Sequence, residues 1–596
     1  MTLARGGRLP ALCAVMTLLV SIGFALRPAR ATAQEFRRDV YLVVIDHATM
    51  EDLLAAPELR GLASTGGAAL LSDALPIRDA IRYLAPNDTP RSVGPALYPE
   101  ALHLSFESSV ESAEGIASVA AIRKIAQDLR DSLSTGYDDD ALVIVASESP
   151  PRASAEAKDV LTGIIVGRGR PLDLAAAMSG VAPSANAIGS LTSDSTRRAG
   201  VVTTRDVATS VADYLGVVPL GGDPAGATIR SIPGPPPFDL HERYLEMRRM
   251  VVPVETAAGI YVTLAALLGI ALLLSRRGPR WLVGAIAFGA LSTSGLGVAL
   301  LAAGHLPALS YATVVPFLVG VTVLSTWALV PLARRDALLA PAAIGAAVLA
   351  YFAVEASLGW TAALTTLHGG SELDGGRFYG LPNAFIGLLI GASVYVAHRL
   401  RTRSGFALIV GVGLFAGLPY IGSNLGGAVS LFAAAGIWLA IRERERLGWW
   451  KGVAAVAGTV VLGTVVVLVA HRVAPAATHI TRFEESSGGL AGAWSTFVDR
   501  LAVGWRLIQR NPFGLIPVLG LLACLWLALR PPTPVREALA AYPGWRDVVV
   551  TIVLAGIVAY VANDSGAAAC GMAFALGFGG LMYVSLILAA AKMERT

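Results

Sequence analysis

The strongest constraint on this chain is a series of apolar runs between residues 255 and 590, each roughly long enough to cross a bilayer as an α-helix of about 17–25 residues. Charged residues make up only 15% of the 596 residues, whereas soluble proteins carry about 25%. The pattern predicts an all-α polytopic bundle of about eleven helices. The expected spans are 255–275, 281–303, 310–332, 338–358, 380–398, 405–420, 425–441, 452–470, 512–529, 548–563 and 567–590.

Basic residues divide the loops between these runs into two sets. Lys and Arg gather in the loops at 276–280, 334–335, 399–403, 442–451 and 530–546, and the intervening loops carry almost none. By the positive-inside rule the basic loops are cytoplasmic, which places residues 34–235 outside the membrane. Because topology accounts for the basic residues, the net charge of +4 does not indicate nucleic-acid binding.

The first 33 residues resemble an export signal. Two arginines precede an apolar stretch at 11–26, and Ala31-Thr32-Ala33 fits a small-x-small cleavage site. An uncleaved anchor is the alternative, and either one exports the region C-terminal to it. We therefore predict a multi-pass protein of a bacterial-type plasma membrane, with an extracytoplasmic domain at 34–235, a linker at 236–254 and an outer interfacial helix at about 492–510.

The exported region alternates strands and helices. YLVVID (41–46), ALVIVAS (141–147) and TGIIVG (162–167) are typical of buried strands, and amphipathic stretches lie between and after them. This order predicts an α/β domain with a mainly parallel sheet. In such sheets the chemistry lies at the carboxyl ends of strands, where the sequence places Asp46, His47, Ser147 and Glu148.

Three segments of the exported region carry a family resemblance. YLVVIDHATMEDLL, TGIIVGRG and TSDSTRRAGVVTTRDVATSVADYLGV, within residues 38–235, resemble the alkaline-phosphatase superfamily, which includes sulfatases and phosphoglycerate mutases. The resemblance implies a fold for metal-dependent phospho- or sulfo-transfer. It also implies two divalent ions held by Asp and His, with Asp46 placed like the first metal-binding Asp, and a Ser or Thr nucleophile.

The chain departs from that family where the chemistry lies. Ala146–Arg152 reads ASESPPR where the family has Ser-Asp-His-Gly, and Ser72 and Asp73 stand without supporting context at the expected nucleophile position. Zinc needs three or four converging ligands, and only three histidines precede the first predicted span, of which His241 lies in the linker. We therefore predict a pseudoenzyme without a cofactor and without a metal site, Asp46 being the single candidate ligand.

Four polar clusters interrupt the apolar runs at their predicted outer ends, at 375–385, 417–427, 478–485 and 562–569. Ionisable and amide side chains are costly in lipid and tend to mark a pathway or a binding site. The candidate catalytic residues are Asp564 and Glu355. The candidate binding residues at the outer face are Arg377, Tyr379, Asn383, Asn424, His479, Arg482, Asn563 and Asp564.

Three functions fit these patterns. The first is a cell-envelope protein that handles a lipid-linked or phosphorylated precursor at the outer face, by transferring a group or by moving the lipid. The second is a non-enzymatic binding or scaffold protein. The third is an active metal-dependent phosphotransferase that resembles ethanolamine-phosphate transferases. The expected partners are membrane lipids and the envelope precursor, and not nucleic acid.

Overall fold

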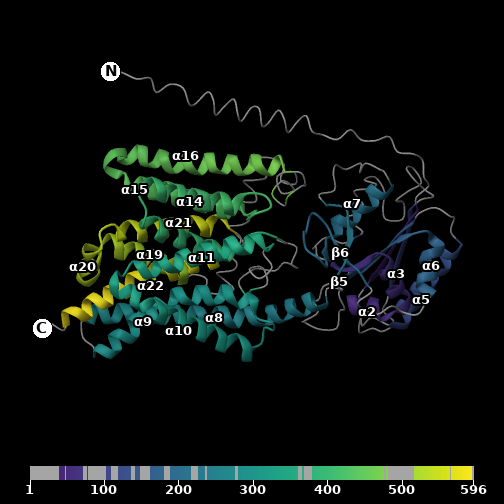
Figure 1. Cartoon of the computed structure of the whole chain (residues 1–596), viewed down its shortest axis with the longest axis horizontal. Helices are drawn as coiled ribbons and strands as arrows, with labels where there is room; N and C mark the ends of the chain where they lie inside the picture. Colours follow the sequence, from purple (N-terminus) through teal and green to yellow (C-terminus); the bar gives the residue numbers. More distant parts are fainter. Residues whose placement is uncertain are drawn as a thin grey trace, which may run out of the picture.

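The computed structural model of the chain contains an α/β domain followed in sequence by a helical bundle (Figure 1). It describes residues 39–46, 48–71, 77, 102–108, 119–135, 141–147, 162–179, 188–215, 226–234, 238–275, 279–359, 366–367, 379–474, 478, 480, 516–563 and 566–593. All structural statements concern these residues.

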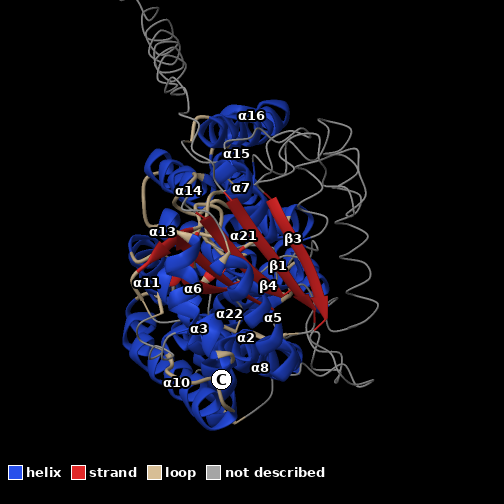
Figure 2. Ribbon diagram, turned by 90° about the vertical axis from the view of Figure 1, so that its right-hand side faces the viewer, coloured by secondary structure: helices blue, strands red, loops and turns tan. Residues whose placement is uncertain are grey.

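The α/β domain is built on an eight-stranded sheet in the order β3-β1-β4-β5-β2-β6-β8, with β7 paired to β2. Strand β1 runs parallel to β3 and β4, as Figure 2 shows, but β5 runs antiparallel to both of its neighbours. The sheet is therefore mixed, where the sequence predicted a mainly parallel one. The strands are β1 (Asp39–Asp46), β2 (Gly67–Leu71), β3 (Leu102–Ser108), β4 (Ala141–Ser147), β5 (Thr162–Gly169), β6 (Ser190–Thr192), β7 (Val201–Val202) and β8 (Arg230–Ile232).

Helices cover both faces of this sheet. Because successive side chains of a strand point to opposite faces, Leu42 and Val44 pack with α7, while Val43 and Ile45 belong to the cluster that includes the other helices. Figure 1 shows α7 apart from α2, α3, α5 and α6. Their bounds are α2 (Met50–Ala55), α3 (Pro57–Thr65), α5 (Val119–Ser134), α6 (Pro171–Ser179) and α7 (Thr204–Leu215).

The bundle is compatible with a polytopic membrane protein. Eight described helices are long and apolar enough to cross a membrane: α8 (Phe238–Ser275), α9 (Arg280–Ala302), α10 (Tyr311–Arg335), α11 (Leu339–Ser357), α15 (Leu425–Arg442), α16 (Arg444–Arg472), α21 (Trp545–Ala562) and α22 (Gly566–Met593). Three more are apolar but shorter: α13 (Ile386–His398), α14 (Thr402–Gly417) and α19 (Ile516–Leu529). At 13 residues α13 spans only about 20 Å, and the total of eleven spans stays a prediction.

Among the eight long apolar helices, α22 is the most buried and α16 the least, and α16 lies at the edge of the bundle in Figure 1. Close backbone contact holds α13 against α22. A Cβ added at Gly387 would lie 1.7 Å from the carbonyl oxygen of Ala569, so only glycine permits this approach. The contact fixes the position of the short helix η5 (Asn383–Phe385), which leads directly into α13.

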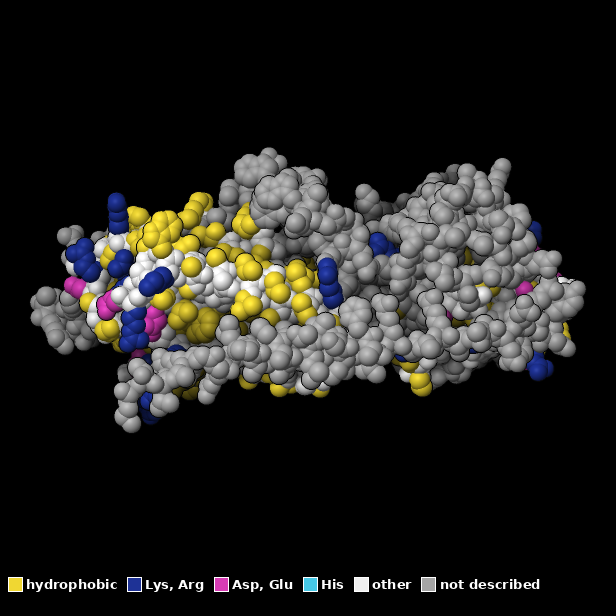
Figure 3. Space-filling model, turned by 90° about the horizontal axis from the view of Figure 1, so that it is seen from above, with side chains coloured by type: hydrophobic (Ala, Val, Ile, Leu, Met, Phe, Trp, Pro, Cys, Tyr) yellow, Lys and Arg dark blue, Asp and Glu magenta, His cyan; other side chains and the backbone are white. Residues whose placement is uncertain are grey.

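Lys and Arg side chains gather at the end of the bundle opposite the α/β domain, with a broad hydrophobic band between (Figure 3). At that end Arg399 pairs with Asp336 at 2.8 Å, and Arg444 pairs with Asp547 at 3.2 Å. The separation agrees with the loop charges from which orientation was predicted.

Helix α8 joins the two parts. Its 38 residues extend about 57 Å, almost twice the hydrocarbon thickness, and it begins within the segment predicted as a linker. Arg243 donates to the carbonyls of Leu306 (2.6 Å) and Gly304 (3.1 Å), and Glu246 accepts from the Leu309 amide at 2.9 Å. The N-terminal part of α8 thereby holds the connection between α9 and α10, which contains the short helix η4 (Ala303–His305).

Candidate functional site at the junction of the two parts

Asn424 links two loops at the α/β-domain end of the bundle. Its Oδ1 accepts a hydrogen bond from the Gly427 amide at 2.8 Å, which caps the N-terminus of α15. Its Nδ2 donates to Leu381 O and to Asn383 Oδ1, both at 2.9 Å. All of the amide's polar atoms are thus engaged in holding residues 381–383 against the start of α15.

Asn563 approaches the same helix start from α21. Its Nδ2 donates to Ala559 O at 2.9 Å and reaches Ser430 Oγ at 3.5 Å. A Cβ added at Gly426 would lie 2.7 Å from Asn563 Oδ1, so α21 is in direct contact with the first turn of α15. Within the described residues this buried Oδ1 has no hydrogen-bond partner.

Left-handed backbone conformations shape the loop between α14 and α15. Tyr420 (φ 65°) and Ser423 (φ 46°) both adopt positive φ, which is uncommon for residues other than glycine. The Leu381 amide donates to Gly422 O at 2.8 Å, and Gly380 has φ 88° with no room for a Cβ. The two loops are therefore stacked through their backbones, with Tyr379 and Tyr420 beside the α/β domain.

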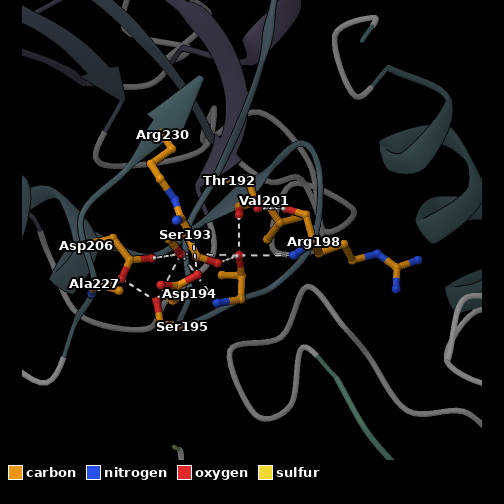
Figure 4. Close-up of polar contacts among 10 residues, drawn as sticks. Thr192, Ser193, Asp194, Ser195, Arg198, Val201, Asp206, Ala227 and Arg230 are labelled. Atoms are coloured by element: carbon orange, nitrogen blue, oxygen red, sulfur yellow. Dashed lines mark hydrogen bonds and ion pairs between the residues drawn. The ribbon is translucent and has the colours of Figure 1, made fainter. Parts of the chain in front are cut away.

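The α/β domain contributes a loop between β6 and β7 that is held by the buried carboxylate of Asp206 (Figure 4). Asp206 accepts from Ser193 Oγ at 2.7 Å, from the Thr203 and Ala227 amides at 2.8 Å, and from Ser195 Oγ. Two further bonds tighten the loop, from Thr196 Oγ1 to Val201 O at 2.7 Å and from the Arg197 amide to Ser193 O at 2.8 Å. Four acceptor bonds on one carboxylate make this loop a rigid support.

That loop places Arg197 on the bundle. Arg197 has φ 53°, and its guanidinium lies 4.2 Å from the ring centroid of Tyr379 and 3.8 Å from that of Tyr420. Both are cation–π contacts, and they join the α/β domain to the two loops that Asn424 holds together. We call Arg197, Tyr379, Asn383, Tyr420 and Asn424 the junction cluster.

His471, in the last turn of α16, borders the junction cluster. Its Nε2 lies 2.8 Å from Gly417 O and its Nδ1 lies 2.7 Å from Thr478 Oγ1. Since a carbonyl only accepts, Nε2 carries a proton and donates to Gly417 O. His471 thereby joins the last turn of α16 to the end of α14.

Glu355 lies in a separate contact at the same end of the bundle. The buried carboxylate is 3.7 Å from His305 Nε2, and the Tyr351 hydroxyl is 3.3 Å from the same nitrogen. One turn earlier on α11, Phe352 contacts Phe385 with ring centroids 5.8 Å apart. The Phe352–Phe385 contact connects this end of α11 to η5, whose first residue, Asn383, belongs to the junction cluster.

A serine joins the end of β4 to the segment that follows β1. Ser147 Oγ, at the end of β4, accepts from the Ala48 amide at 3.2 Å, just beyond the end of β1. Asp46 ends β1, but its side chain and His47 lie outside the described residues. No group of three or more His, Cys, Asp or Glu side chains suited to a metal occurs in the part of the chain that is described.

Four predicted site residues fall within or beside the junction cluster: Tyr379, Asn383, Asn424 and Asn563. The other predicted binding residues, Arg377, His479, Arg482 and Asp564, lie outside the described residues, as does the predicted interfacial helix at 492–510. Sequence reasoning missed Arg197 and Tyr420 as site residues. The loop TSDSTRRAG was conspicuous only as part of a family resemblance, and nothing local indicates that its first arginine reaches the bundle.

The fold and the junction define this chain as a polytopic membrane protein with an N-terminal α/β domain that docks on one end of its helical bundle. No family model, no curated protein and no solved structure matches it.

Proposed function

We propose that this protein handles a lipid-linked or phosphorylated precursor at the membrane face where the α/β domain meets the bundle, by transferring a group or by moving the lipid. The observation that carries the proposal is the junction cluster itself. Non-helical, amide-rich backbone interrupts apolar helices there, and such segments are tolerated at membrane depth only when buried in protein or lining a polar site. A cationic side chain from the α/β domain meets them.

In this proposal the α/β domain serves as a binding element and not as the catalyst. It resembles the alkaline-phosphatase superfamily, but its sequence lacks the Ser-Asp-His-Gly motif. Its contribution is a rigid loop that presents Arg197 to the bundle. The orientation that we propose places this junction at the extracytoplasmic face, since the basic loops lie at the other end.

Lipid photocrosslinking tests the proposal directly. The full-length protein in nanodiscs is irradiated with a photoactivatable polyisoprenyl phosphate or with a photoactivatable phosphatidylcholine, and the modified peptides are mapped by mass spectrometry. We expect the isoprenoid probe to label residues 379–385 and 417–424 in excess over phosphatidylcholine. The exposed apolar face of α16 (Val461, Leu462, Val465) serves as the comparison. The proposal is overturned if the ratio of isoprenoid to phosphatidylcholine labelling is the same on this face as at the junction.

A scaffold function is the second candidate, and one observation favours it. Asn424 uses all its polar atoms in structural hydrogen bonds, so this residue needs no ligand. A scaffold predicts that the isoprenoid and phosphatidylcholine probes label the junction equally.

An active phosphotransferase requires a bound divalent ion near Asp46. Elemental analysis of the purified full chain tests this third candidate. A stoichiometric ion that Asp46→Asn removes would support it, and an ion that survives the substitution would not belong to that site.

A further inference from the structure

Arg197 stacks on two tyrosine rings, and one nitrogen of its guanidinium has no hydrogen-bond partner among the described residues. A guanidinium sandwiched between two rings uses its faces, whereas its five N–H donors lie in the plane of the group and point sideways between the rings. Within the described residues Nη2 of Arg197 is buried and has no hydrogen-bond partner. A buried charged donor without an acceptor is costly, so the arrangement favours a ligand that supplies one.

The nearby acids on the loop and on α7 are already engaged. Asp194, on the loop, pairs with Arg230, and Asp206, in the first turn of α7, accepts four hydrogen bonds. Among the described residues no carboxylate lies within ion-pair distance of Arg197. Its positive charge is therefore held in place without a recorded counter-charge.

A second donor lies nearby on the bundle. Ser423 is fully buried, and its Oγ has no hydrogen-bond partner within the described residues. Its Cβ lies 3.4 Å from where a Cβ on Gly380 would stand, so Ser423 is packed against the residue that follows Tyr379. Ser423 also lies three residues after Tyr420, on whose ring Arg197 stacks. Guanidinium and hydroxyl groups are donors that bind the oxygens of a phosphate group.

We propose that Arg197, with Ser423, binds the phosphate group of the precursor at the junction of the α/β domain and the bundle. This inference rests on the proposed function and deepens it, because it names the chemical group that is recognised and the residue that recognises it. Tyr379 and Tyr420 act as positioning residues that hold the guanidinium plane. The shared chemistry is a phosphate group, carried as a monoester or diester by a lipid headgroup or present as free phosphate.

The experiment measures the binding of three ligands to the full-length protein in nanodiscs by native mass spectrometry: a polyisoprenyl phosphate, the corresponding polyisoprenyl alcohol and inorganic phosphate. We compare the wild type with Arg197→Gln, Arg197→Lys and the control Arg170→Gln, which changes an exposed arginine on the same domain. Charge-assisted hydrogen bonds of this kind correspond to about a tenfold to hundredfold change in affinity.

The expected result is a loss of about tenfold or more in phosphate-lipid affinity for Arg197→Gln, with alcohol affinity unchanged. Arg197→Lys should lose most of the same discrimination, because lysine keeps the charge but neither the planar fork nor the stacking. Arg170→Gln should bind like the wild type. If inorganic phosphate competes with the phosphate lipid, the site recognises the phosphate group alone. If it does not compete, the site recognises the phosphate as part of a lipid headgroup.

Two results overturn the inference and leave the proposed function standing. In one, Arg197→Gln binds the phosphate lipid as tightly as the wild type. In the other, it loses the phosphate lipid and the alcohol equally, which is the signature of a purely structural arginine. If the wild type binds neither lipid, the proposed function fails. In that case phosphate binding by Arg197 is supported only if the wild type binds inorganic phosphate and Arg197→Gln does not.

Discussion

Replacing Asn424 tests whether the junction cluster is held together as its hydrogen bonds indicate. Asn424→Ala removes the N-cap of α15, worth about 1 kcal/mol. It also removes the bonds to Leu381 O and Asn383 Oδ1, worth about 1 kcal/mol each. The sum of about 3 kcal/mol corresponds to roughly a hundredfold rise in the local opening equilibrium of the two loops.

Hydrogen exchange of the full-length protein measures that equilibrium. The reporters are the amides of Leu381, bonded to Gly422 O at 2.8 Å, and of Asn424, bonded to Ala416 O at 2.8 Å. We expect faster exchange in both loops for Asn424→Ala. Asn424→Asp keeps the acceptor that caps α15 but places a carboxylate oxygen against Leu381 O and Asn383 Oδ1. Hydrogen exchange should therefore rise in residues 381–383 but not in the first turn of α15.

Ser310→Ala provides the matched control. Ser310 caps α10 at the same end of the bundle, accepting from the Thr313 amide, and has no recorded bond to another loop. Its replacement should cost about 1 kcal/mol and raise exchange only around the start of α10. The proposed role of Asn424 is refuted if Asn424→Ala perturbs exchange no more than Ser310→Ala, or if residues 381–383 keep their protection in Asn424→Asp.

Three other tests probe the loop, the bundle packing and the topology. Asp206→Ala leaves two backbone amides and two hydroxyls without their acceptor. We expect a local loss of about 3 kcal/mol, seen as faster hydrogen exchange across 190–207, and weaker phosphate-lipid binding in native mass spectrometry. Gly387→Ala puts a Cβ 1.7 Å from a backbone oxygen of α22 and should abolish the monodisperse peak in size-exclusion chromatography, whereas Gly320→Ala, with no atom within 4 Å, should not. In a background without native cysteines, impermeant maleimide on intact cells should label Ser134→Cys and spare Arg446→Cys; the reverse pattern would invert the topology.

The helical bundle could be predicted because its signal is strong and local. Uninterrupted apolar runs with charges confined to the loops indicate spanning helices in almost any context. The short α13 shows the limit of that reasoning. The expected span 380–398 is divided into a turn, η5 and a 13-residue helix. The division arises because the Asn383 side chain accepts a hydrogen bond from Asn424 and because Gly387 packs directly on the backbone of α22. Both are tertiary contacts.

The direction of β5 shows a different limit. A buried run such as TGIIVG is compatible with a strand in either direction, since the pattern of side-chain burial is the same for both. Its antiparallel pairing to β4 and β2 depends on how the chain enters it. The alternation of strands and helices therefore predicted the class of fold without predicting that the sheet is mixed.

The candidate site divides along the same line between local and tertiary signals. Asn383, Asn424 and Asn563 could be selected from sequence because amides beside Gly and Pro stand out in apolar surroundings. In the structure Asn424 and Asn563 bond mainly to backbone, so what the sequence detected at these positions is the framework of the site. The cation comes from Arg197, which lies on a loop of the α/β domain about 180 residues before Tyr379. Its role depends on the contact between the two parts of the molecule, which no local sequence pattern encodes.

This division makes Arg197 the residue at which the competing functions separate. In a scaffold the arginine matters only as a double cation–π contact between the two parts of the molecule, so any loss on substitution is the same for phosphorylated and neutral ligands. In a protein that handles a phosphorylated precursor, the same stack orients the donors, and substitution changes the discrimination between those ligands. Tyr420→Leu is informative for the same reason. This substitution weakens the stack and keeps the charge. If the Arg197 donors bind phosphate, discrimination between the phosphorylated and the neutral lipid should fall by less than in Arg197→Gln. A purely structural contact predicts no change in this discrimination for either variant.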